Sequence, residues 1–368
     1  MTDQALLTPL RVGPYALRHR VVMPPLTRLR AEEPHSAPDG LNALYYGQRA
    51  SEGGLIIAEA TWSSSQGKPY YSAPGIESEQ QIQGWRAVVD AVHAKGGVIF
   101  LQLWHAGRIG HSSTKPGGAL PVAPSAVAAR GETRTASGGT APFEVPRALE
   151  TEEIARLVDS FRDGARNALA AGFDGVELHG ANGYLFEQFL QSRTNHRTDA
   201  YGGPLKNRVR FLLEATHAVA SVFGADRVGV RLSPYGVAND SGEPDPLPLY
   251  TYVVQSLAPL GLAYLHLIEP RSSGIGVAEV DRSDQPLAAA LFRAHWPGVL
   301  ISAGGFSVAS ANEVISAGHA DAIGFGRAFI ANPDLPRRIR LGAALNAHER
   351  PTFYTAGPRG YTDYPALD

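Results

Sequence analysis

Residues 151–184 carry the sequence TEEIARLVDSFRDGARNALAAGFDGVELHGANGY. The first part predicts an amphipathic helix, with Thr151 as the expected N-cap residue and Gly172 beyond its end. The apolar side chains expected on the buried face of this helix are Ile154, Leu157, Val158 and Phe161. A short apolar strand at Gly175–Leu178 and a polar, glycine-containing turn follow. A helix that leads into a strand with a continuous apolar run is typical of a parallel sheet.

The same alternation of strand and helix recurs along the chain. Helical periodicity is expected at 82–92, 209–219 and 249–257 and after the N-cap residue Ser307. Apolar, mostly β-branched runs predict eight strands, at Arg20–Met23, Leu55–Glu59, Val98–Leu103, Gly175–Leu178, Val228–Leu232, Tyr264–Ile268, Val299–Ser302 and Ala322–Phe325. The pattern favours an α/β fold in which a single (β/α)₈ TIM barrel closes on itself. The alternative is an open doubly wound sheet, which is expected to carry G-x-G-x-x-G after its first strand. Residues 23–27, which follow the first predicted strand here, are MPPLT and do not match that motif.

The composition limits the possible functions. The 368 residues fit one domain spanning 1–368, and 33 Lys and Arg against 35 Asp and Glu give a formal net charge of −2. A chain with this net charge has no overall positive potential that would attract nucleic acid or an anionic membrane. The chain has no apolar run long enough to span a membrane and no signal-peptide layout, so we expect a cytoplasmic protein. The absence of Cys excludes disulfides, thiolate zinc sites, cysteine nucleophiles and Cys-held iron–sulfur clusters.

Residues 111–147 interrupt the alternation. They are rich in Gly, Pro, Ser, Thr and Ala, lack helical periodicity, and follow the third strand. Loops of this length are usually functional or disordered. Because the C-terminal ends of the strands carry the active site of a barrel, we expect a capping subdomain here, with a disordered insert as the alternative.

Glycine-rich turns follow the seventh and eighth predicted strands. Gly304, Gly305 and Gly326 would let backbone N–H groups approach a ligand closely, and Arg327 could add a forked contact to an anion. Turns at these two positions are the usual phosphate site of a barrel. The pair predicts a phosphorylated ligand or cofactor; the alternative is that the glycines only form turns.

Polar side chains also stand in or after other predicted strands. Gln102 and Arg231 lie within apolar runs. They indicate a planar polar ligand above them; the alternative is that the buried Arg forms a structural ion pair with Glu59 or Glu177. The turn after the fourth strand carries His179 and Asn182, which can offer hydrogen bonds to one oxygen, and Tyr184, which can supply a proton. No second His or carboxylate has the spacing of a zinc site, so no metal is expected. The aromatic candidates for a pocket wall are Tyr70, Trp104, Phe353 and Tyr354, each of which could equally be core packing.

These motifs together resemble the Old Yellow Enzyme family of flavin-dependent ene-reductases, and most of all its bacterial branch that includes pentaerythritol tetranitrate reductase, morphinone reductase and N-ethylmaleimide reductase. The likeness runs almost from end to end. The segments that carry it are His19–Ala31, Ile56–Thr61, Phe100–Arg108, Gly172–Gly203, Val228–Pro234, Gly324–Pro336 and Phe353–Leu367. The third and fourth are highly specific when found together. The resemblance implies non-covalent FMN in the barrel and NADPH or NADH as the hydride donor.

The resemblance also implies roles for particular positions. The flavin ring would be contacted by Pro25, Thr27, Ala60, Gln102 and Arg231. Its phosphate would be held by Gly304, Gly305, Gly326 and Arg327. The substrate oxygen would bind His179 and Asn182, Tyr184 would be the proton donor, and the substrate pocket would be lined by Tyr70, Trp104 and Tyr354. Relatives often carry His-x-x-His where this chain has His179 and Asn182, so we expect the same binding role with an altered substrate preference.

The implied reaction is ping-pong. NADPH reduces the flavin and leaves; hydride then passes to the β carbon of an α,β-unsaturated carbonyl or nitro compound, and Tyr184 protonates the α carbon. The alternatives are a barrel aldolase or isomerase for a phosphorylated substrate, a silent ligand-binding barrel, and reduction of nitrate esters or nitroaromatics as the main role of the same site. The partners are small molecules, and both a monomer and a homodimer are compatible with the sequence.

Overall fold

The eight predicted strands form one parallel sheet in the computed structural model, which describes residues 4–270 and 285–368. The strands are β3 (Val21–Val22), β4 (Leu55–Trp62), β5 (Val98–Trp104), β10 (Gly175–Gly180), β11 (Val228–Leu232), β12 (Tyr264–Ile268), β13 (Leu300–Ala303) and β14 (Ala322–Gly324). They pair in the order β3, β14, β13, β12, β11, β10, β5, β4. Each one overlaps a predicted strand, which confirms the TIM-barrel prediction.

Met23, directly after β3, closes the sheet into a barrel. Its N–H donates to the Leu55 carbonyl at 3.0 Å, and its own carbonyl accepts from the Ile57 N–H at 2.8 Å, so the two ends of the sheet are joined. The register between β4 and β5 shifts between Ala58 and Thr61. Because all eight strands run in the same direction, their C-terminal ends meet on one side of the molecule.

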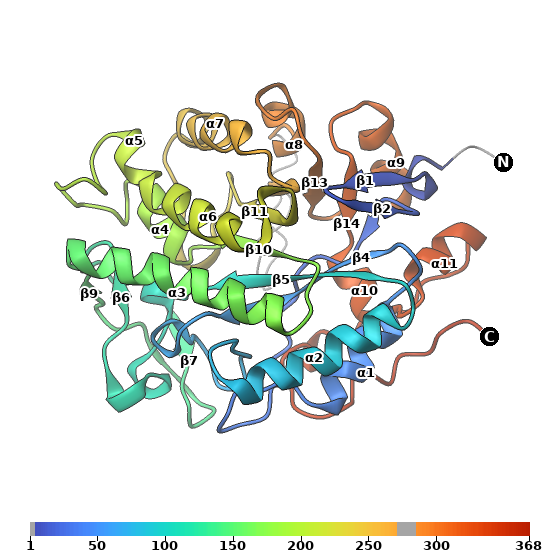
Figure 1. Ribbon diagram of the computed structural model, residues 1–368, viewed down its shortest axis with the longest axis horizontal. Helices are drawn as coiled ribbons and strands as arrows, with labels where there is room; N and C mark the ends of the chain where they lie inside the picture. Colours follow the sequence, from blue (N-terminus) through green and yellow to red (C-terminus); the bar gives the residue numbers. More distant parts are fainter. Residues whose placement is uncertain (1–3, 271–284) are drawn as a thin grey trace.

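Helices cover the outside of the barrel (Figure 1). The longer ones are α1 (Gly40–Arg49), α2 (Glu79–His93), α3 (Thr151–Ala170), α6 (Arg210–Phe223), α7 (Pro246–Leu257) and α9 (Val308–Ser316). Five of these confirm helices expected from apolar periodicity. Shorter helices are α4 (Leu185–Leu190), α5 (Leu205–Arg208), α8 (Ala288–Phe292), α10 (Gly326–Ala331) and α11 (Leu335–Leu341).

The N-terminus of α3 differs by one residue from the prediction. The N-cap is Glu150, whose N–H donates to the Glu153 carboxylate at 2.8 Å, while the Glu153 N–H donates to the main-chain carbonyl of Glu150 at 3.1 Å. Thr151 is the first helical residue, and its hydroxyl donates to Asp199 at 2.6 Å. The expected N-cap hydroxyl is therefore used in a tertiary contact, and the Glu153 carboxylate binds the N-cap N–H in the first turn of the helix.

Three small sheets of two strands each were not predicted. The hairpin of β1 (Leu10–Val12) and β2 (Tyr15–Leu17) packs Val12 and Leu17 against Phe100 and Tyr264, and so covers the N-terminal end of the barrel. Within residues 111–147, β7 (Glu132–Arg134) and β8 (Thr140–Pro142) form a second hairpin, while β6 (Val122–Ala123) pairs with β9 (Arg147–Ala148). Three-residue strands of mixed polarity carry too little periodicity to be detected in a sequence.

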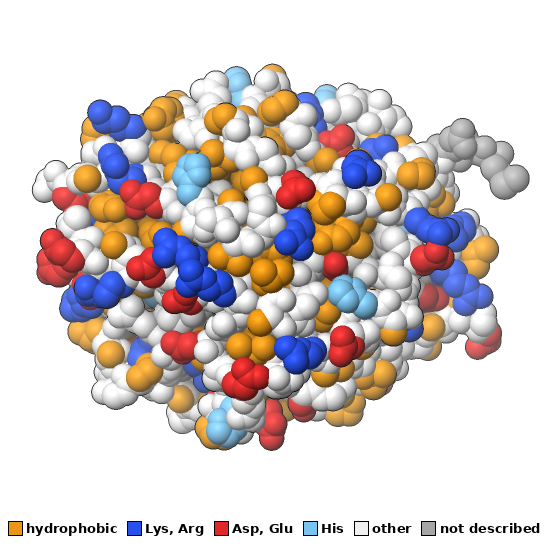
Figure 2. Space-filling model, viewed as in Figure 1, with side chains coloured by type: hydrophobic (Ala, Val, Ile, Leu, Met, Phe, Trp, Pro, Cys, Tyr) orange, Lys and Arg blue, Asp and Glu red, His pale blue; other side chains and the backbone are white. Residues whose placement is uncertain are grey.

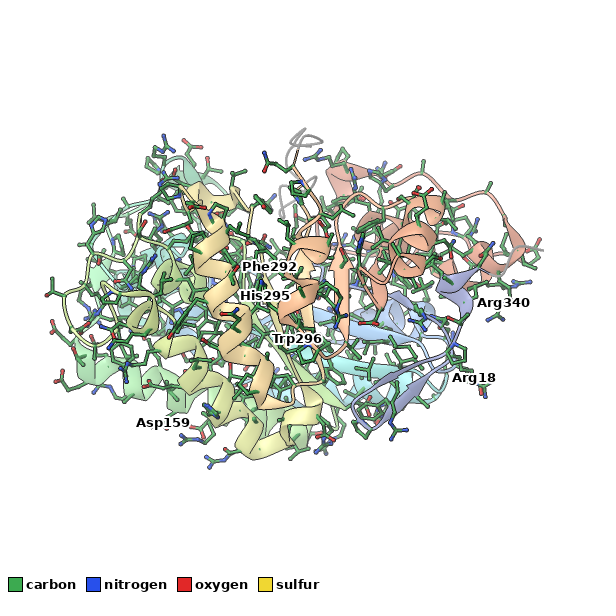
Figure 3. The ribbon with its side chains drawn as sticks, turned by 90° about the horizontal axis from the view of Figure 1, so that it is seen from above. Arg18, Asp159, Phe292, His295, Trp296 and Arg340 are labelled. Atoms are coloured by element: carbon green, nitrogen blue, oxygen red, sulfur yellow. The ribbon has the colours of Figure 1, made fainter. Side chains whose placement is uncertain are left out.

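The distribution of charged side chains on the surface is consistent with the small net charge. On the face drawn in Figure 2, Lys and Arg side chains are interspersed with Asp and Glu. Arg18 and Asp159 lie at the outside of the molecule, whereas Phe292 and Trp296 are buried near α8 (Figure 3). In the described residues, no helix combines the length and apolarity that crossing a membrane requires.

Candidate active site

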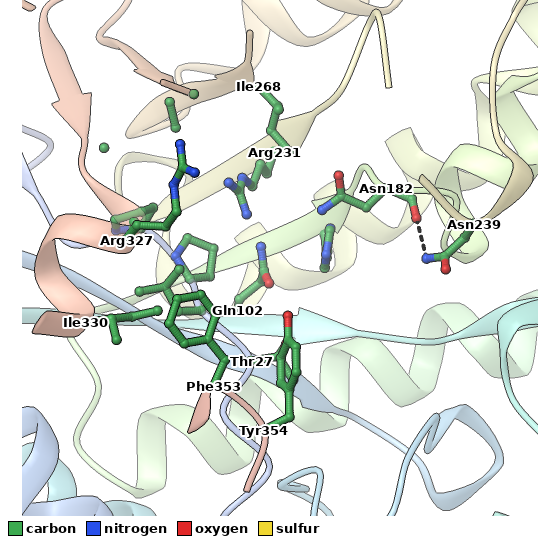
Figure 4. Close-up of a pocket in the computed structure, with 18 of the residues that line it drawn as sticks. Thr27, Gln102, Asn182, Arg231, Asn239, Ile268, Arg327, Ile330, Phe353 and Tyr354 are labelled. Atoms are coloured by element: carbon green, nitrogen blue, oxygen red, sulfur yellow. Dashed lines mark hydrogen bonds between the residues drawn. The ribbon is translucent and has the colours of Figure 1, made fainter. Parts of the chain in front are cut away.

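A cavity of about 660 Å³ lies at the C-terminal ends of the barrel strands. Six strands of the main sheet, β5 and β10 to β14, each contribute a lining residue. In strand order these residues are Gln102, His179, Arg231, Ile268, Ala303 and Gly324. The predicted site residues that it brings together are Pro25, Thr27, Tyr70, Gln102, His179, Asn182, Tyr184, Arg231, Gly304, Gly305, Gly326, Arg327 and Tyr354. Figure 4 shows several of these side chains around the cavity.

The end of β10 and the turn after it present three of these residues. His179 is the penultimate residue of β10, Asn182 adopts a left-handed conformation with φ of 58°, and Tyr184 is the N-cap of α4. Asn and Asp tolerate this conformation better than most residues with a side chain. The carbonyl of Asn182 accepts from Asn239 Nδ2 at 2.8 Å (Figure 4). The strand end and the turn therefore bring an imidazole, an amide and a phenol to the cavity.

Burial determines the protonation of two of these groups. It lowers the pKa of His179 well below its ordinary value, with the positive charge of Arg231 adding to the effect. Burial also raises the pKa of Tyr184 well above 10, with the Tyr70 phenol as a further cause. At neutral pH His179 is therefore a neutral ring with one N–H donor, and Tyr184 keeps its phenolic proton.

Gln102 and Arg231 stand beside a buried carboxylate. The Gln102 amide nitrogen donates to Glu177 at 2.7 Å, and His266 Nδ1 lies 2.8 Å from the other Glu177 oxygen. Arg231 forms no ion pair with a described residue, and burial lowers its pKa. One of the two amide N–H groups of Gln102 is thus occupied, which leaves its carbonyl oxygen and the second N–H available to a ligand. The predicted alternative, a structural ion pair of Arg231 with Glu59 or Glu177, is not found among the described residues. Both Gln102 and Arg231 line the cavity.

Backbone glycines form another side of the cavity. Gly304 and Gly305 follow β13 with φ of 137° and 68°, values that side chains disfavour. Gly326 starts α10, and a Cβ there would lie 3.2 Å from Leu26. Arg327 follows it and also lines the cavity (Figure 4). The two turns lie together, as expected of a phosphate site formed after the last two strands.

Aromatic side chains form an outer wall. Tyr70, Phe353 and Tyr354 line the cavity, and the Tyr70 hydroxyl lies 3.4 Å from the Tyr184 hydroxyl. Trp104 is not a lining residue: it is almost fully buried, with its ring 4.8 Å from that of Tyr184, edge to face. Ala60, predicted to touch the flavin ring, is also buried without lining the cavity. Trp104 therefore supports Tyr184 from behind.

Other lining residues were missed by the sequence interpretation. Apolar ones are Pro24, Leu26, Leu29, Phe143, Phe306, Phe325, Ala328 and Ile330, and polar ones are Glu132, Thr133, Arg134, Asn239, Ser307 and Arg350. Glu132 to Arg134 form β7, and Phe143 follows β8, so the segment 111–147 contributes to the rim. Its position after the third strand was the available signal, but no motif identified the particular residues.

The Phe353–Tyr354 wall is held by arginines from the loop after β3. Arg28 Nε donates to the Phe353 carbonyl at 3.1 Å and Nη2 donates to the Gly360 carbonyl at 2.6 Å. Arg30 donates to the carbonyls of Thr352, Gly357 and Arg359 at 2.9–3.0 Å. These bonds join segments more than 320 residues apart, so sequence proximity gives no sign of them.

These features define the class of the protein: a barrel oxidoreductase with one site for a planar, phosphorylated cofactor. The chain belongs to the NADH:flavin oxidoreductase / NADH oxidase family, whose model matches residues 5–346, and so to the Old Yellow Enzyme family. It is 45% identical to 12-oxophytodienoate reductase 2 of Arabidopsis thaliana over 365 residues, which are 99% of this chain and 96% of the relative.

Solved structures agree. Morphinone reductase in complex with tetrahydroNAD is 47% identical, with a TM-score of 0.91 and coverage of 99% of this chain and 98% of that one. The old yellow enzyme homologue from Zymomonas mobilis is 41% identical, with a TM-score of 0.92 and coverage of 98% and 99%. The recognition of the family from sequence motifs is confirmed.

FMN is the cofactor of this family, and NAD(P)H is its reductant. The residues of the cavity fit that cofactor. Buried polar atoms without a hydrogen-bond partner among the described residues include Arg231 Nε, His179 Nδ1 and Asn182 Oδ1, all on lining residues. Buried polar groups are rarely left unpaired, so these atoms indicate ligands that complete the site. The glycine turns after β13 and β14 leave room for a phosphate.

Proposed function

We propose that the protein is an ene-reductase, which reduces the activated double bond of α,β-unsaturated carbonyl or nitro compounds with NADPH as the expected hydride donor. Bound FMN supplies the hydride chemistry, accepting from the nicotinamide and donating to the substrate β carbon in separate half-reactions. The observation that carries the proposal is the convergence of His179, Asn182 and Tyr184 on the cavity that also contains Gln102 and Arg231.

Pro25, Thr27, Gln102 and Arg231 are proposed to hold the flavin ring. Arg231 is a buried cation without an ion-pair partner among the described residues, so it would stabilise negative charge on the ring. The Gln102 carbonyl would accept from a ring N–H. Gly304, Gly305, Gly326 and Arg327 are proposed to hold the phosphate through backbone N–H groups and the guanidinium. Ala60 would act only from behind the lining residues.

His179 and Asn182 are proposed to bind the substrate oxygen. A neutral imidazole and an amide are both donors, and drawing charge onto the carbonyl or nitro oxygen makes the β carbon more electrophilic. Tyr184 keeps its proton at neutral pH because burial raises its pKa. It is proposed to deliver that proton to the α carbon, with Tyr70 and Tyr354 lining the substrate space. Residues 111–147 would cover the site through the hairpin of β7 and β8.

An aldolase or isomerase is the weaker candidate. Such enzymes need a Schiff-base lysine or a carboxylate base close to the substrate. Of the described residues that line the cavity, none is a lysine, and the single acidic residue is Glu132 of the rim hairpin. The lining therefore favours redox chemistry on a bound cofactor over proton abstraction.

The test separates the two half-reactions of the FMN-loaded protein. Tyr184→Phe should slow the reduction of 2-cyclohexenone by roughly 10²- to 10⁴-fold, the usual contribution of a proton donor. Reduction of the flavin by NADPH should stay nearly intact, because no proton from Tyr184 enters that step. Tyr70→Phe, which removes the neighbouring hydroxyl, is the matched control and should lose far less. Equal losses in both half-reactions of Tyr184→Phe would contradict the assigned role.

A further inference from the structure

Glu187 is a fully buried acid directly beneath the turn after β10. It lies in α4, where every residue is buried, and it is the single charged residue of that helix. It forms no ion pair with any described residue, although buried carboxylates normally do. Keeping such a group in the core costs stability unless several donors surround it.

Three donors meet the Glu187 carboxylate. Oε2 accepts from the Gly183 N–H at 2.5 Å, and Oε1 accepts from the hydroxyls of Ser233 at 2.7 Å and Tyr250 at 2.6 Å. Ser233 follows β11 and Tyr250 belongs to α7, and both are fully buried. The carboxylate therefore ties the turn to two neighbouring elements of the barrel.

Two paths of hydrogen bonds, which we call arms, lead from the Glu187 carboxylate to successive residues of the turn. The Ser233 hydroxyl accepts from the N–H of Asn182 at 2.9 Å, and Oε2 binds the N–H of Gly183 directly. Asn182 has the unfavourable φ of 58°, which persists only where the surroundings hold it. An apolar side chain at 187 could fill the same space, but it would leave the Gly183 N–H without an acceptor.

We infer that Glu187 is a positioning residue, which fixes the direction of the Asn182 amide and the Tyr184 phenol through the backbone of residues 182–183. This inference rests on the proposed function for its catalytic meaning. Glu187 does not line the cavity, so it acts on a ligand through the turn. Its effect should consequently appear in the binding of the substrate oxygen and should spare the cofactor.

The experiment is a double-mutant cycle on the FMN-loaded protein, with 4-hydroxybenzaldehyde as the phenolic probe and the flavin spectrum as the readout. Glu187→Leu should weaken probe binding roughly tenfold, the scale expected when a buried donor is left unpaired. In an Asn182→Ala background the same change should have much less further effect on the binding of the phenolic oxygen, because the amide that Glu187 directs toward that oxygen is already removed. Losses that multiply in the double variant would overturn the inference.

Two further variants keep the test decisive if Glu187→Leu folds poorly. Glu187→Gln retains the shape and one acceptor and should lose only a few-fold in affinity, and Ser233→Ala breaks one arm and should lie between the two. Thr216→Val removes a buried hydrogen bond to Leu212 in α6 and controls for general destabilisation. Probe affinity that follows thermal stability across all four variants would mean that Glu187 is merely structural.

Amide hydrogen exchange separates this inference from the proposed function. Glu187→Leu should raise exchange at Gly183 at least tenfold while leaving β10 protected, because the turn loses its acceptor and the strand does not. A wild-type protein that binds FMN but no phenolic probe would contradict the proposed function, and exchange at Gly183 would still decide whether Glu187 holds the turn. Unchanged exchange at Gly183 would overturn the inference.

Discussion

The floor and the wall of the cavity are held in different ways. We call Gln102, His179 and Arg231 the floor, and Phe353 and Tyr354 the wall. The floor residues stand on three adjacent strands, and His179 is the direct ladder partner of Arg231. Their relative positions follow from the hydrogen-bonded register of the barrel, as in any sheet with a buried face.

The wall has no such ladder. It follows a short 3₁₀ turn, Arg350–Thr352, and is held by guanidinium groups that donate to main-chain carbonyls. The comparison teaches that floor geometry is a property of the fold, whereas wall geometry depends on two side chains, Arg28 and Arg30. Mutations of floor residues should therefore remove particular contacts while the fold keeps its geometry, whereas mutations of Arg28 or Arg30 should shift the wall itself.

The largest effect is expected on the floor. His179→Ala removes one of the two donors to the substrate oxygen and should lower kcat/KM for 2-cyclohexenone by roughly 10²- to 10³-fold. Binding of 4-hydroxybenzaldehyde should weaken as well, since the same donors would bind the phenolate. FMN content should not change, which absorbance of the purified variant measures. An unchanged affinity for the phenol would refute the oxygen-binding role.

The pH dependence of stability tests the raised pKa of Glu187, which lies next to the turn after β10. Burial raises the pKa of Glu187 from 4.5 to about 7, so its ionisation is harder in the folded state than in the unfolded state. The wild-type protein should therefore lose stability relative to Glu187→Gln as pH rises from about 4.5 to 7, by up to ~3 kcal/mol at 1.36 kcal/mol per pKa unit. Urea unfolding of both proteins at pH 5 and pH 8 measures the difference. A stability gap that is the same at both pH values would contradict the raised pKa.

The wall should give a smaller and more selective effect. Arg30→Met leaves the carbonyls of Gly357 and Arg359 without their donor and removes one of the two donors to the Thr352 carbonyl. This loss should loosen the wall and raise the KM for the enone roughly tenfold. Arg30→Lys keeps the charge but lacks the forked geometry, so its KM should lie between those of the wild type and of Arg30→Met. FMN affinity should stay as in the wild type. Loss of FMN in parallel with the rise in KM would break the distinction between floor and wall.

The floor could be predicted from the sequence because each of its residues belongs to a local pattern. Gln102 and Arg231 interrupt apolar runs that were recognised as strands, and parallel strands bring their C-terminal ends together. The direction of the side chains at the end of β4 could not be predicted in the same way, because the register between β4 and β5 shifts between Ala58 and Thr61. Ala60 is buried there and does not line the cavity, and its contact with the flavin ring stays a prediction.

The wall could be predicted only in part. Phe353 and Tyr354 were candidates because they are aromatic and belong to a family motif, yet their partners Arg28 and Arg30 lie more than 320 residues away. The Glu187 network has the same character, because Ser233 and Tyr250 come from two other elements. Networks that join distant buried polar groups have no periodicity, and so they become visible only in three dimensions.

The most direct test of the account is an anaerobic titration of the purified, FMN-supplemented protein followed by its flavin absorbance. We predict about one FMN per chain, bleaching of the flavin band by NADPH with NADH run alongside, and return of the band when 2-cyclohexenone is added. A protein that stays colourless after incubation with FMN, or whose reduced flavin is not reoxidised by the enone, would contradict the proposed ene-reductase function.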